Sequence, residues 1–246
     1  MTNGLYTTAV GMVPQMYKQE VIANNLANVN TTGYKKDGML FQKVLDANLF
    51  TQLQNGDFNF EPDVQDNVRD FKQGPFVPTG SNFDVAIEGD GFFVVETPQG
   101  MALTRNGNFT LDADGRLVSN AGYPVVGEDG YIEIDEKTSD FQISEDGEIF
   151  VNKSRANKFL IQTVTDKQGL EKFGDSLFRP KNPNVEVTQM DQYRIQQGYL
   201  EQSNVNPVEE MVNMLITMRQ FEAMQKTVNF HNETLGKAVN ELGRVA

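Results

Sequence analysis

The sequence predicts an α+β fold, with a long amphipathic helix at each end of the chain and an antiparallel β-domain between them. Two observations lead to this prediction. Near both termini, apolar residues recur at three- and four-residue steps, as they do on one face of a helix. In the middle of the chain the period changes to two, and Asp-Gly and Asn-Gly dipeptides separate the alternating runs. That pattern is typical of short strands joined by tight turns.

The first helix is predicted from Leu5 to Leu26. Its apolar positions form two adjacent stripes, which together make one broad apolar face. The first stripe contains Leu5, Ala9, Met12, Met16, Ala23 and Leu26, and the second contains Tyr6, Val10, Val13, Tyr17 and Val21. The turn-forming residues 28–33 are expected to end this helix.

The second helix is predicted to begin at Pro207, with Asn206 as its N-cap and Glu209 placed to complete a capping box. A 3.5-residue repeat of apolar residues then runs to about Arg244, and Gln225 and Asn232 occupy the same stripe. The apolar members are Met211, Met214, Met218, Phe221, Val228, Leu235, Val239 and Leu242.

The lengths of the two helices bear on what they pack against. The first spans roughly 36–39 Å and the second roughly 57 Å, at 1.5 Å per residue. The helices can pack on each other within one chain, but about a third of the longer apolar stripe would then have no partner. Exposed apolar stripes of this kind are interaction surfaces. We therefore predict an assembly interface made of Leu5, Met12, Met16, Leu26, Met211, Met214, Leu215, Met218, Phe221, Val228 and Leu235.

The central region is predicted to be a small barrel or sandwich of antiparallel strands. Its alternating pairs are Phe83, Val85 and Ile87, Phe109 and Leu111, Ile132 and Ile134, Phe141 and Ile143, Ile149 and Val151, and Phe159 and Ile161. Tight hairpin turns are expected at Asp90-Gly91, Asn106-Gly107, Asp114-Gly115, Asp129-Gly130 and Asp146-Gly147. The predicted organisation is a helical segment 1–33, a partly ordered connector 34–75, a β-domain 76–200 and a helical segment 201–246.

Composition excludes several classes of function. The formal net charge of −13 repels phosphate backbones, which argues against nucleic-acid binding. The chain has no cysteine, so disulfides, thiolate metal sites and cysteine nucleophiles are excluded. No apolar run approaches the ~18 residues that span a bilayer. A cleavable signal peptide requires a basic residue near its start, but no lysine or arginine precedes Lys18, so no such signal is predicted.

The residues that suggest chemistry are better explained by structure. Asp112–Gly115 resembles the start of a calcium loop, but Tyr123 stands where the twelfth-position glutamate belongs. His231 is the only histidine, and no nucleophile elbow or sufficient set of zinc ligands accompanies it. No lysine follows Gly89–Gly91, so this run is not a phosphate cradle. We predict no catalytic residue, metal, cofactor or small-molecule substrate, and a hydrolase with paired carboxylates remains an alternative.

Four runs of residues resemble, in order along the chain, the signatures of bacterial flagellar rod and hook proteins. They are Ala23–Lys35, Asp84–Phe93, Thr104–Phe109, and Gly198–Asn206 together with the following Glu209–Met214. The signature positions taken from the first and last runs are Asn24, Asn25, Leu26, Asn28, Gly33, Ser203, Asn204 and Val205.

This resemblance implies a non-enzymatic subunit that is exported, without a cleaved signal, through the flagellar type III apparatus. Members of the family polymerise with other rod subunits in the basal body, within the periplasmic space. Their terminal helices line the export channel and their β-domain faces outward. The short segment Leu45–Phe83 and the run Gly122–Gly130 favour the proximal type of rod subunit. A distal-type subunit and a β-domain binding module on a helical stalk remain alternatives.

Overall fold

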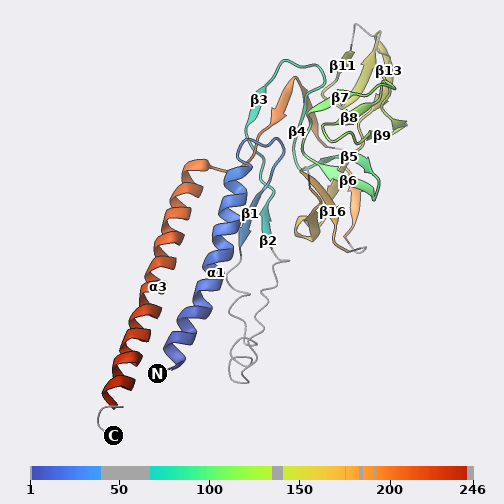
Figure 1. Cartoon of the computed structure of the whole chain (residues 1–246). Helices are drawn as coiled ribbons and strands as arrows, with labels where there is room; N and C mark the ends of the chain where they lie inside the picture. Colours follow the sequence, from blue (N-terminus) through green and yellow to red (C-terminus); the bar gives the residue numbers. More distant parts are fainter. Residues whose placement is uncertain are drawn as a thin grey trace. The chain divides into compact units, whose positions relative to one another are not determined.

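The computed structural model describes residues 2–39, 67–134, 141–174, 176–182, 185–190 and 192–242 (Figure 1). The chain divides into two compact units. The helical unit comprises Met1–Ala27, Asp37–Val68 and Asn206–Ala246, and the β-unit comprises Asn28–Lys36 and Arg69–Val205. The first contains two long packed helices and the second contains antiparallel sheets, which confirms the predicted α+β class.

The two helices, α1 (Thr2–Ala27) and α3 (Pro207–Leu242), pack against each other as an antiparallel pair (Figure 1). Asn25 lies against Glu210, and a Cβ atom added to Gly11 would lie 3.9 Å from the Sδ atom of Met224. These two contact points are the same number of residues apart on each helix, so the pair stays in register along its length.

The predicted start of α3 is confirmed. The Oδ1 atom of Asn206 accepts hydrogen bonds from the N–H groups of Val208, at 3.1 Å, and Glu209, at 3.4 Å. These N–H groups have no partner within the first turn of a helix, and an asparagine side chain at the N-cap supplies one.

Two short strands lie within the predicted connector 34–75. β1 (Lys36–Met39) and β2 (Asn67–Asp70) form a two-stranded sheet. Residues 40–66, the middle of that predicted connector, lie outside the described residues.

The strands of the β-unit are short, and every pairing recorded between them is antiparallel. The largest sheet runs in the order β10-β9-β5-β6-β16-β15. β14 pairs with β5, and β17 pairs with β14. A 3-10 turn, η1 (Lys167–Gly169), precedes β15. The strands are β3 (Phe76–Pro78), β4 (Val85–Glu88), β5 (Phe92–Thr97), β6 (Gly100–Thr104), β7 (Phe109–Leu111), β8 (Leu117–Ser119), β9 (Val125–Gly127), β10 (Gly130–Tyr131), β11 (Phe141–Ile143), β12 (Glu148–Val151), β13 (Ser154–Lys158), β14 (Ile161–Val164), β15 (Leu170–Lys172), β16 (Leu177–Pro180), β17 (Val187–Gln189), β18 (Arg194–Gln197) and β19 (Tyr199–Glu201).

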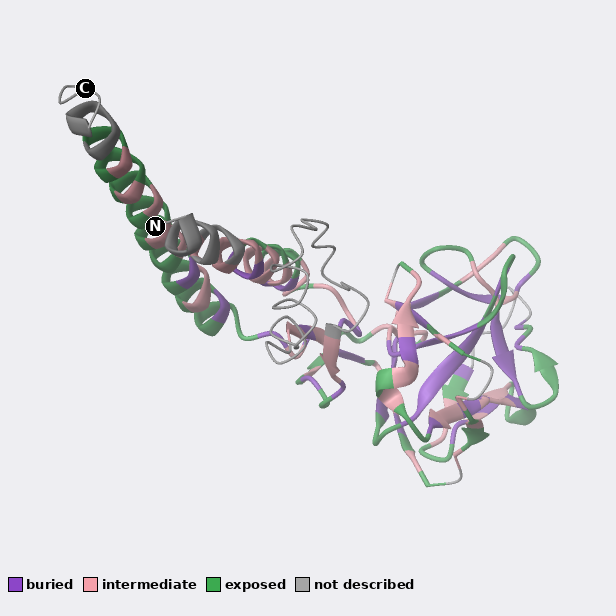
Figure 2. Cartoon of the chain, turned by 90° about the horizontal axis from the view of Figure 1, so that it is seen from below, coloured by how far each residue is buried: buried purple, intermediate pink, exposed green. Residues whose placement is uncertain are grey.

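Strand β5 is the centre of the core, and both of its faces are covered. Phe93 packs in the larger hydrophobic cluster, at 5.1 Å from the ring of Phe109 and 5.4 Å from that of Phe159. Phe92 points into the smaller cluster, at 5.9 Å from the ring of Phe178. A strand buried on both faces has a continuous apolar sequence, which explains why Phe92–Val95 does not alternate. Figure 2 shows buried residues concentrated on the strands, whereas α3 is largely exposed.

Three of the five predicted hairpin turns are confirmed. Asp114-Gly115, Asp129-Gly130 and Asp146-Gly147 each join two paired strands, with glycine φ angles of 77°, 105° and 80°. The sequence did not reveal a further hairpin turn at Asn152-Lys153, where both residues have positive φ angles.

The other two hairpin predictions are wrong. Asp90-Gly91 lies between β4 and β5, which pair with different strands, and Asn106-Gly107 lies between β6 and β7, which do likewise. Gly107 serves another purpose, because a Cβ atom there would lie 1.6 Å from the carbonyl oxygen of Val85. Only glycine allows this close approach of two backbones.

Candidate assembly surface

One side of α3 forms the seam with α1. Its buried and half-buried positions recur at alternating three- and four-residue steps, as in a coiled coil. They are Glu210, Met214, Thr217, Phe221, Met224, Val228, His231 and Leu235. Met214, Phe221, Val228 and Leu235 belong both to this seam and to the stripe predicted from the sequence. The predicted stripe also included Gln225 and Asn232, but these are exposed, and the neighbouring Met224 and His231 lie in the seam. A 3.5-residue repeat fits two helical registers that differ by one residue. The correct register was missed because several of its positions, such as Glu210, Thr217 and His231, are polar.

Two buried polar residues of the helix pair, Asn25 and Thr217, make hydrogen bonds. Asn25 is 1% exposed; its Nδ2 atom donates to the carbonyl of Asp37 at 2.8 Å and to Oε2 of Glu210 at 3.4 Å. Its Oδ1 atom accepts from the N–H of Asp37 at 2.9 Å. Thr217, fully buried, donates to the carbonyl of Asn213 at 2.8 Å. The signature residue Asn25 therefore fixes the start of β1 beside the helix pair.

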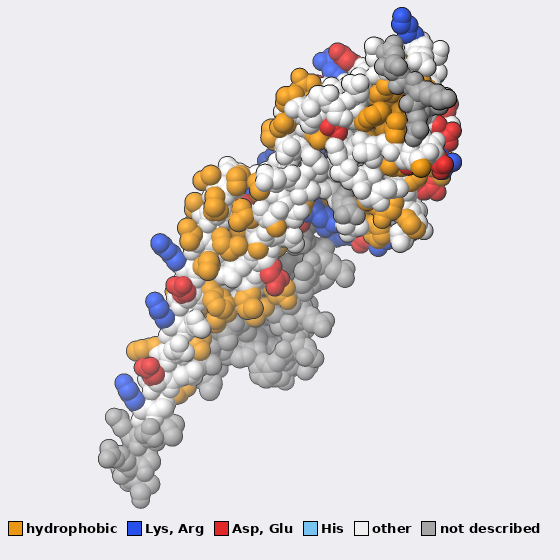
Figure 3. Space-filling view, turned by 45° about the horizontal axis from the view of Figure 1, so that its top comes forward, with side chains coloured by type: hydrophobic (Ala, Val, Ile, Leu, Met, Phe, Trp, Pro, Cys, Tyr) orange, Lys and Arg blue, Asp and Glu red, His pale blue; other side chains and the backbone are white. Residues whose placement is uncertain are grey.

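A second apolar face lies on the first three turns of α3. Six large side chains there are between 47% and 64% exposed. They are Val208, Met211, Val212, Leu215, Ile216 and Met218. Leu215 is 58% exposed and Thr217 is buried, because residues two apart lie about 160° apart around a helix. α3 is thus apolar on two opposite sides, and no residue in the described part of the chain buries its outer side, which we call the α3 outer face (Figure 3).

The residues predicted for the assembly interface divide between these two sides. Met211, Leu215 and Met218 lie on the outer face, and Met16 of α1 is also exposed. Half-buried positions are Met12, Leu26, Met214, Phe221, Val228 and Leu235, whereas the side chain of Leu5 lies outside the described residues. Sequence reasoning missed Val208, Val212 and Ile216, although their spacing from Met211 and Leu215 already marks a second helical stripe.

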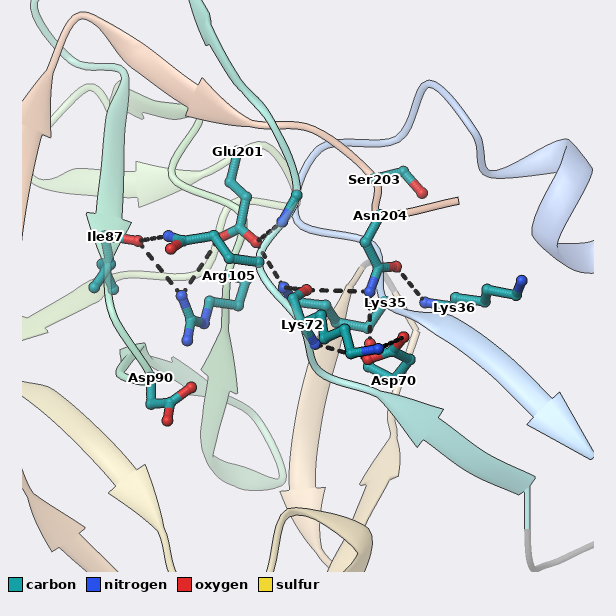
Figure 4. A network of polar contacts seen from close by, with 12 residues as sticks. Lys35, Lys36, Asp70, Lys72, Ile87, Asp90, Arg105, Glu201, Ser203 and Asn204 are labelled. Atoms are coloured by element: carbon teal, nitrogen blue, oxygen red, sulfur yellow. Dashed lines mark hydrogen bonds and ion pairs between the residues drawn. The ribbon is translucent and has the colours of Figure 1, made fainter. Parts of the chain in front are cut away.

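A buried ion cluster is the main polar feature of the β-unit (Figure 4). Glu201 is 1% exposed, and its Oε1 atom lies 2.6 Å from Nζ of Lys35. Its Oε2 atom lies 3.3 Å from Nη1 of Arg105, and Oε1 also accepts a 2.9 Å hydrogen bond from the N–H of Gly74. We call Lys35, Arg105 and Glu201 the Glu201 cluster.

Burial dominates the electrostatics of this cluster. It lowers the pKa of Lys35 and that of Arg105, because desolvation disfavours both charged forms, while Glu201 opposes the change. The cations are also held by carbonyl groups: Lys35 donates to Lys72 at 2.7 Å and Arg105 donates to Gly89 at 2.6 Å. Buried charges persist when they are paired and hydrogen-bonded in this way.

Other signature residues hold the segments around this cluster. Gly33 has a φ of 67°, and a Cβ atom there would lie 2.4 Å from the backbone nitrogen of Asn106. Asn204 accepts from the N–H of Lys36 at 2.8 Å and donates to the carbonyl of Asp70 at 2.7 Å.

The remaining signature positions have more local roles. Ser203 accepts from the N–H of Val205 at 3.3 Å, and both residues are buried. Asn28 accepts a 3.1 Å hydrogen bond from Thr31, in the turn that follows α1. Asn24 is exposed.

The turn that resembles a calcium loop is held by its own hydrogen bonds. The Asp112 carboxylate caps its own turn by accepting from the N–H groups of Asp114 and Arg116. A cleft of 400 Å³ in the β-unit has no charged or histidine side chain among its lining residues. Among the described residues, no group of three or more acidic or histidine side chains could hold a metal ion. No helix in the described ranges combines the length and apolar character needed to cross a membrane.

These features define an assembly subunit: a helix pair with an uncovered apolar face, attached to a self-contained β-unit. Comparison with protein families identifies the family of assembly subunits to which the chain belongs. Residues 5–35 match the flagella basal body rod protein family, 86–151 the flagellar hook protein FlgE/F/G D1 domain, and 196–241 the flagellar basal body rod FlgEFG protein C-terminal family. The chain belongs to the flagellar basal-body rod protein family, as the resemblance of its signatures predicts.

Similar proteins span the whole chain. It is 33% identical to the flagellar basal-body rod protein FlgF of Caulobacter vibrioides, over 100% of both chains. It is 33% identical to FlgG of Borreliella burgdorferi, over 98% of both chains. It is 32% identical to FlgG of Buchnera aphidicola subsp. Schizaphis graminum, over 96% of this chain and 98% of that relative. The protein is therefore a non-enzymatic structural subunit of the flagellar basal-body rod, which assembles with other rod subunits.

Proposed function

We propose that this subunit is of the proximal, FlgF-like type and that it polymerises with neighbouring rod subunits through the α3 outer face. The observation that carries the proposal is the uncovered apolar side of α3, opposite its seam with α1. Burying a valine, leucine, isoleucine or methionine side chain contributes about 1.5–3 kcal/mol when the whole side chain leaves water. Covering six half-exposed side chains contributes on the order of 5 kcal/mol before the entropy cost of association.

The unequal lengths of the helices support the same proposal. α3 has 36 residues and α1 has 26, so α3 is longer by roughly 15 Å. Since Gly11 lies level with Met224 in the antiparallel pair, the start of α1 lies level with about residue 233. The last turns of α3 therefore extend past α1, where a helix of a neighbouring subunit can pack against them.

The FlgF-like type is supported by the lengths of the alignments. Alignments with FlgF relatives extend over 244–249 residues, close to the 246 residues of this chain. Alignments with FlgG relatives extend over 262–267 residues, so they contain more gap positions than the alignments with FlgF relatives. The predicted absence of a longer connector within Leu45–Phe83 agrees with this difference.

We further propose that the subunit is exported through the flagellar type III apparatus without a cleaved signal. Its final location would be the periplasmic space. Both rest on the resemblance to the family. Deleting the export apparatus should leave the subunit inside the cytoplasm, and cell fractionation with an antibody to the β-unit measures this.

The direct test is incorporation of a Leu215→Asp variant into the rod. A charge on the outer face cannot be buried without a large desolvation cost, so the variant should be lost from purified hook–basal bodies while the monomer stays folded. Quantitative mass spectrometry of the particles measures the loss. Gln225→Asp, on an exposed polar position of the same helix, is the matched control and should be incorporated normally.

Two results would decide against the proposal. Normal incorporation of the Leu215→Asp variant would exclude the α3 outer face as an essential contact. A subunit count equal to that of the most abundant rod protein would indicate the FlgG-like type.

A further inference from the structure

The three members of the Glu201 cluster come from three separate signature runs. Lys35 ends the run 23–35, Arg105 belongs to the run 104–109 and Glu201 belongs to the run 198–206. Their side chains are no more than 2% exposed. Each run therefore contributes one charge to a single buried site, which the sequence separation of the runs conceals.

Glu201 binds all the segments through which the chain enters and leaves the β-unit. The segment that follows α1 is bound by Lys35 and by the N–H of Gly33, which donates to the Glu201 carbonyl at 2.8 Å. The segment that begins at Arg69 is bound through Gly74. Glu201 itself lies in the segment that leads to α3. The chain crosses between the units at the outer ends of these same segments.

The charges of the cluster do not balance, since two cations share one anion. Without Glu201, the two buried cations would have no buried partner, and only the solvent-exposed carboxylates of Asp70 and Asp90 would attract them. If only Lys35 is removed, the remaining Arg105 and Glu201 form a neutral pair. The Nζ atom of Lys172 donates a 3.1 Å hydrogen bond to the carbonyl of Lys35. Leaving a buried charge unpaired costs far more than the pair itself contributes.

We propose that the Glu201 cluster is a conditional lock: the segment Asn28–Lys36 stays docked on the β-unit only while the Glu201 carboxylate is in place. The segment after α1 and the segment before α3 are consequently ordered or released together. This inference concerns a single chain and goes beyond the proposed assembly function.

The order of the charges along the chain determines when, during synthesis, the segment after α1 can dock. Both cations precede the anion, so a chain that is made from its N-terminus presents Lys35 and Arg105 before Glu201. Lys35 cannot be buried favourably until Glu201 has been made. The segment after α1 therefore remains undocked until almost the whole β-unit is present, and an incomplete chain does not fix the position of its N-terminal end.

Hydrogen exchange of full-length monomers, read by mass spectrometry, tests the proposal. Glu201→Gln keeps the size of the side chain and removes its charge. We expect exchange in 28–36 and in 198–205 to become at least about 100-fold faster, while β5 amides keep their protection. Lys35→Met leaves the neutral pair and should accelerate exchange less than about 10-fold. Glu171→Gln, which removes the surface partner of Arg179, is the control and should change neither segment.

The double variant Glu201→Gln/Lys35→Met separates this proposal from ordinary hydrogen bonding. Because it removes one of the two unpaired cations, its exchange should be slower than that of Glu201→Gln alone. If Glu201→Gln prevents folding of the whole chain, recovery of a folded β-unit in the double variant supports the lock, and failure to recover overturns it. Equal effects of Lys35→Met and Glu201→Gln, with additive behaviour in the double variant, also overturn it.

Discussion

The two units of this protein differ in where their apolar surface lies. In the β-unit, Phe92–Val95 are fully buried in clusters supplied by the same chain. In the helical unit, Leu215 and its five neighbours on the α3 outer face are about half exposed. Within the described ranges, the chain itself fills the core of the β-unit, whereas it packs against only one of the two apolar sides of α3. The contrast supports our proposal that association depends on the helical unit, whereas the core of the β-unit supplies stability.

The largest expected effect is in the core of the β-unit. Phe93→Ala removes a buried ring that packs between Phe109 and Phe159, and should lower the free energy of unfolding by about 3–5 kcal/mol. Leu215→Ala, on the outer face, should change it by no more than about 0.5 kcal/mol. Denaturant unfolding of the two purified variants, followed by near-ultraviolet dichroism, measures both. Similar losses in the two variants would contradict the contrast between the units.

Sequence periodicity was sufficient for the parts of the fold that depend on local patterns. Both helices, the N-cap Asn206 and three of the hairpin turns follow from spacing and turn chemistry alone. The Asn106-Gly107 dipeptide led to a wrong prediction, because it resembles a hairpin turn. Gly107 is instead needed for a close backbone contact with Val85. That contact joins residues far apart in the sequence, and no local pattern records it.

The assembly surface and the Glu201 cluster were predicted less completely. The 3.5-residue repeat located the helix faces, but it could not choose between Gln225 and Met224 for the seam, because the two positions are adjacent. Charge pairing between Lys35, Arg105 and Glu201 depends on tertiary structure. The one available signal was that each of three family signatures contains a charged residue.

A smaller effect should separate the two sides of α3. Phe221 lies in the seam, so Phe221→Asp should weaken packing of the helix pair by about 1–3 kcal/mol and reduce the helical signal of the monomer. Leu215→Asp should leave that signal unchanged, because the outer face is already in water. Far-ultraviolet dichroism of the two monomers, recorded as the temperature rises, distinguishes them. Equal melting of both variants would show that the seam does not hold the helices together.

The smallest expected effect is an ion pair on the surface of the β-unit. Asp90 Oδ1 lies 2.7 Å from Nζ of Lys167, and the hydrogen bond from this lysine lowers the pKa of Asp90 below its ordinary 3.8. A carboxylate with a lowered pKa in the folded state stabilises that state above the ordinary value. The contribution is lost as the pH falls through the lowered pKa. Since the Asp90 side chain is 69% exposed, solvent screening limits the contribution to at most about 0.5 kcal/mol.

Titration of the Asp90 carboxyl group by NMR checks this prediction directly. The pKa should rise toward 3.8 in a Lys167→Met variant, because the largest cause of its lowering is removed. Asp90→Asn should reduce the melting temperature slightly at neutral pH, and the difference from the unmodified protein should vanish in acid below the lowered pKa. A difference that persists in acid would mean that Asp90 acts through packing. The contrast between the units does not depend on this ion pair, since an exposed pair contributes far less than the rings around β5.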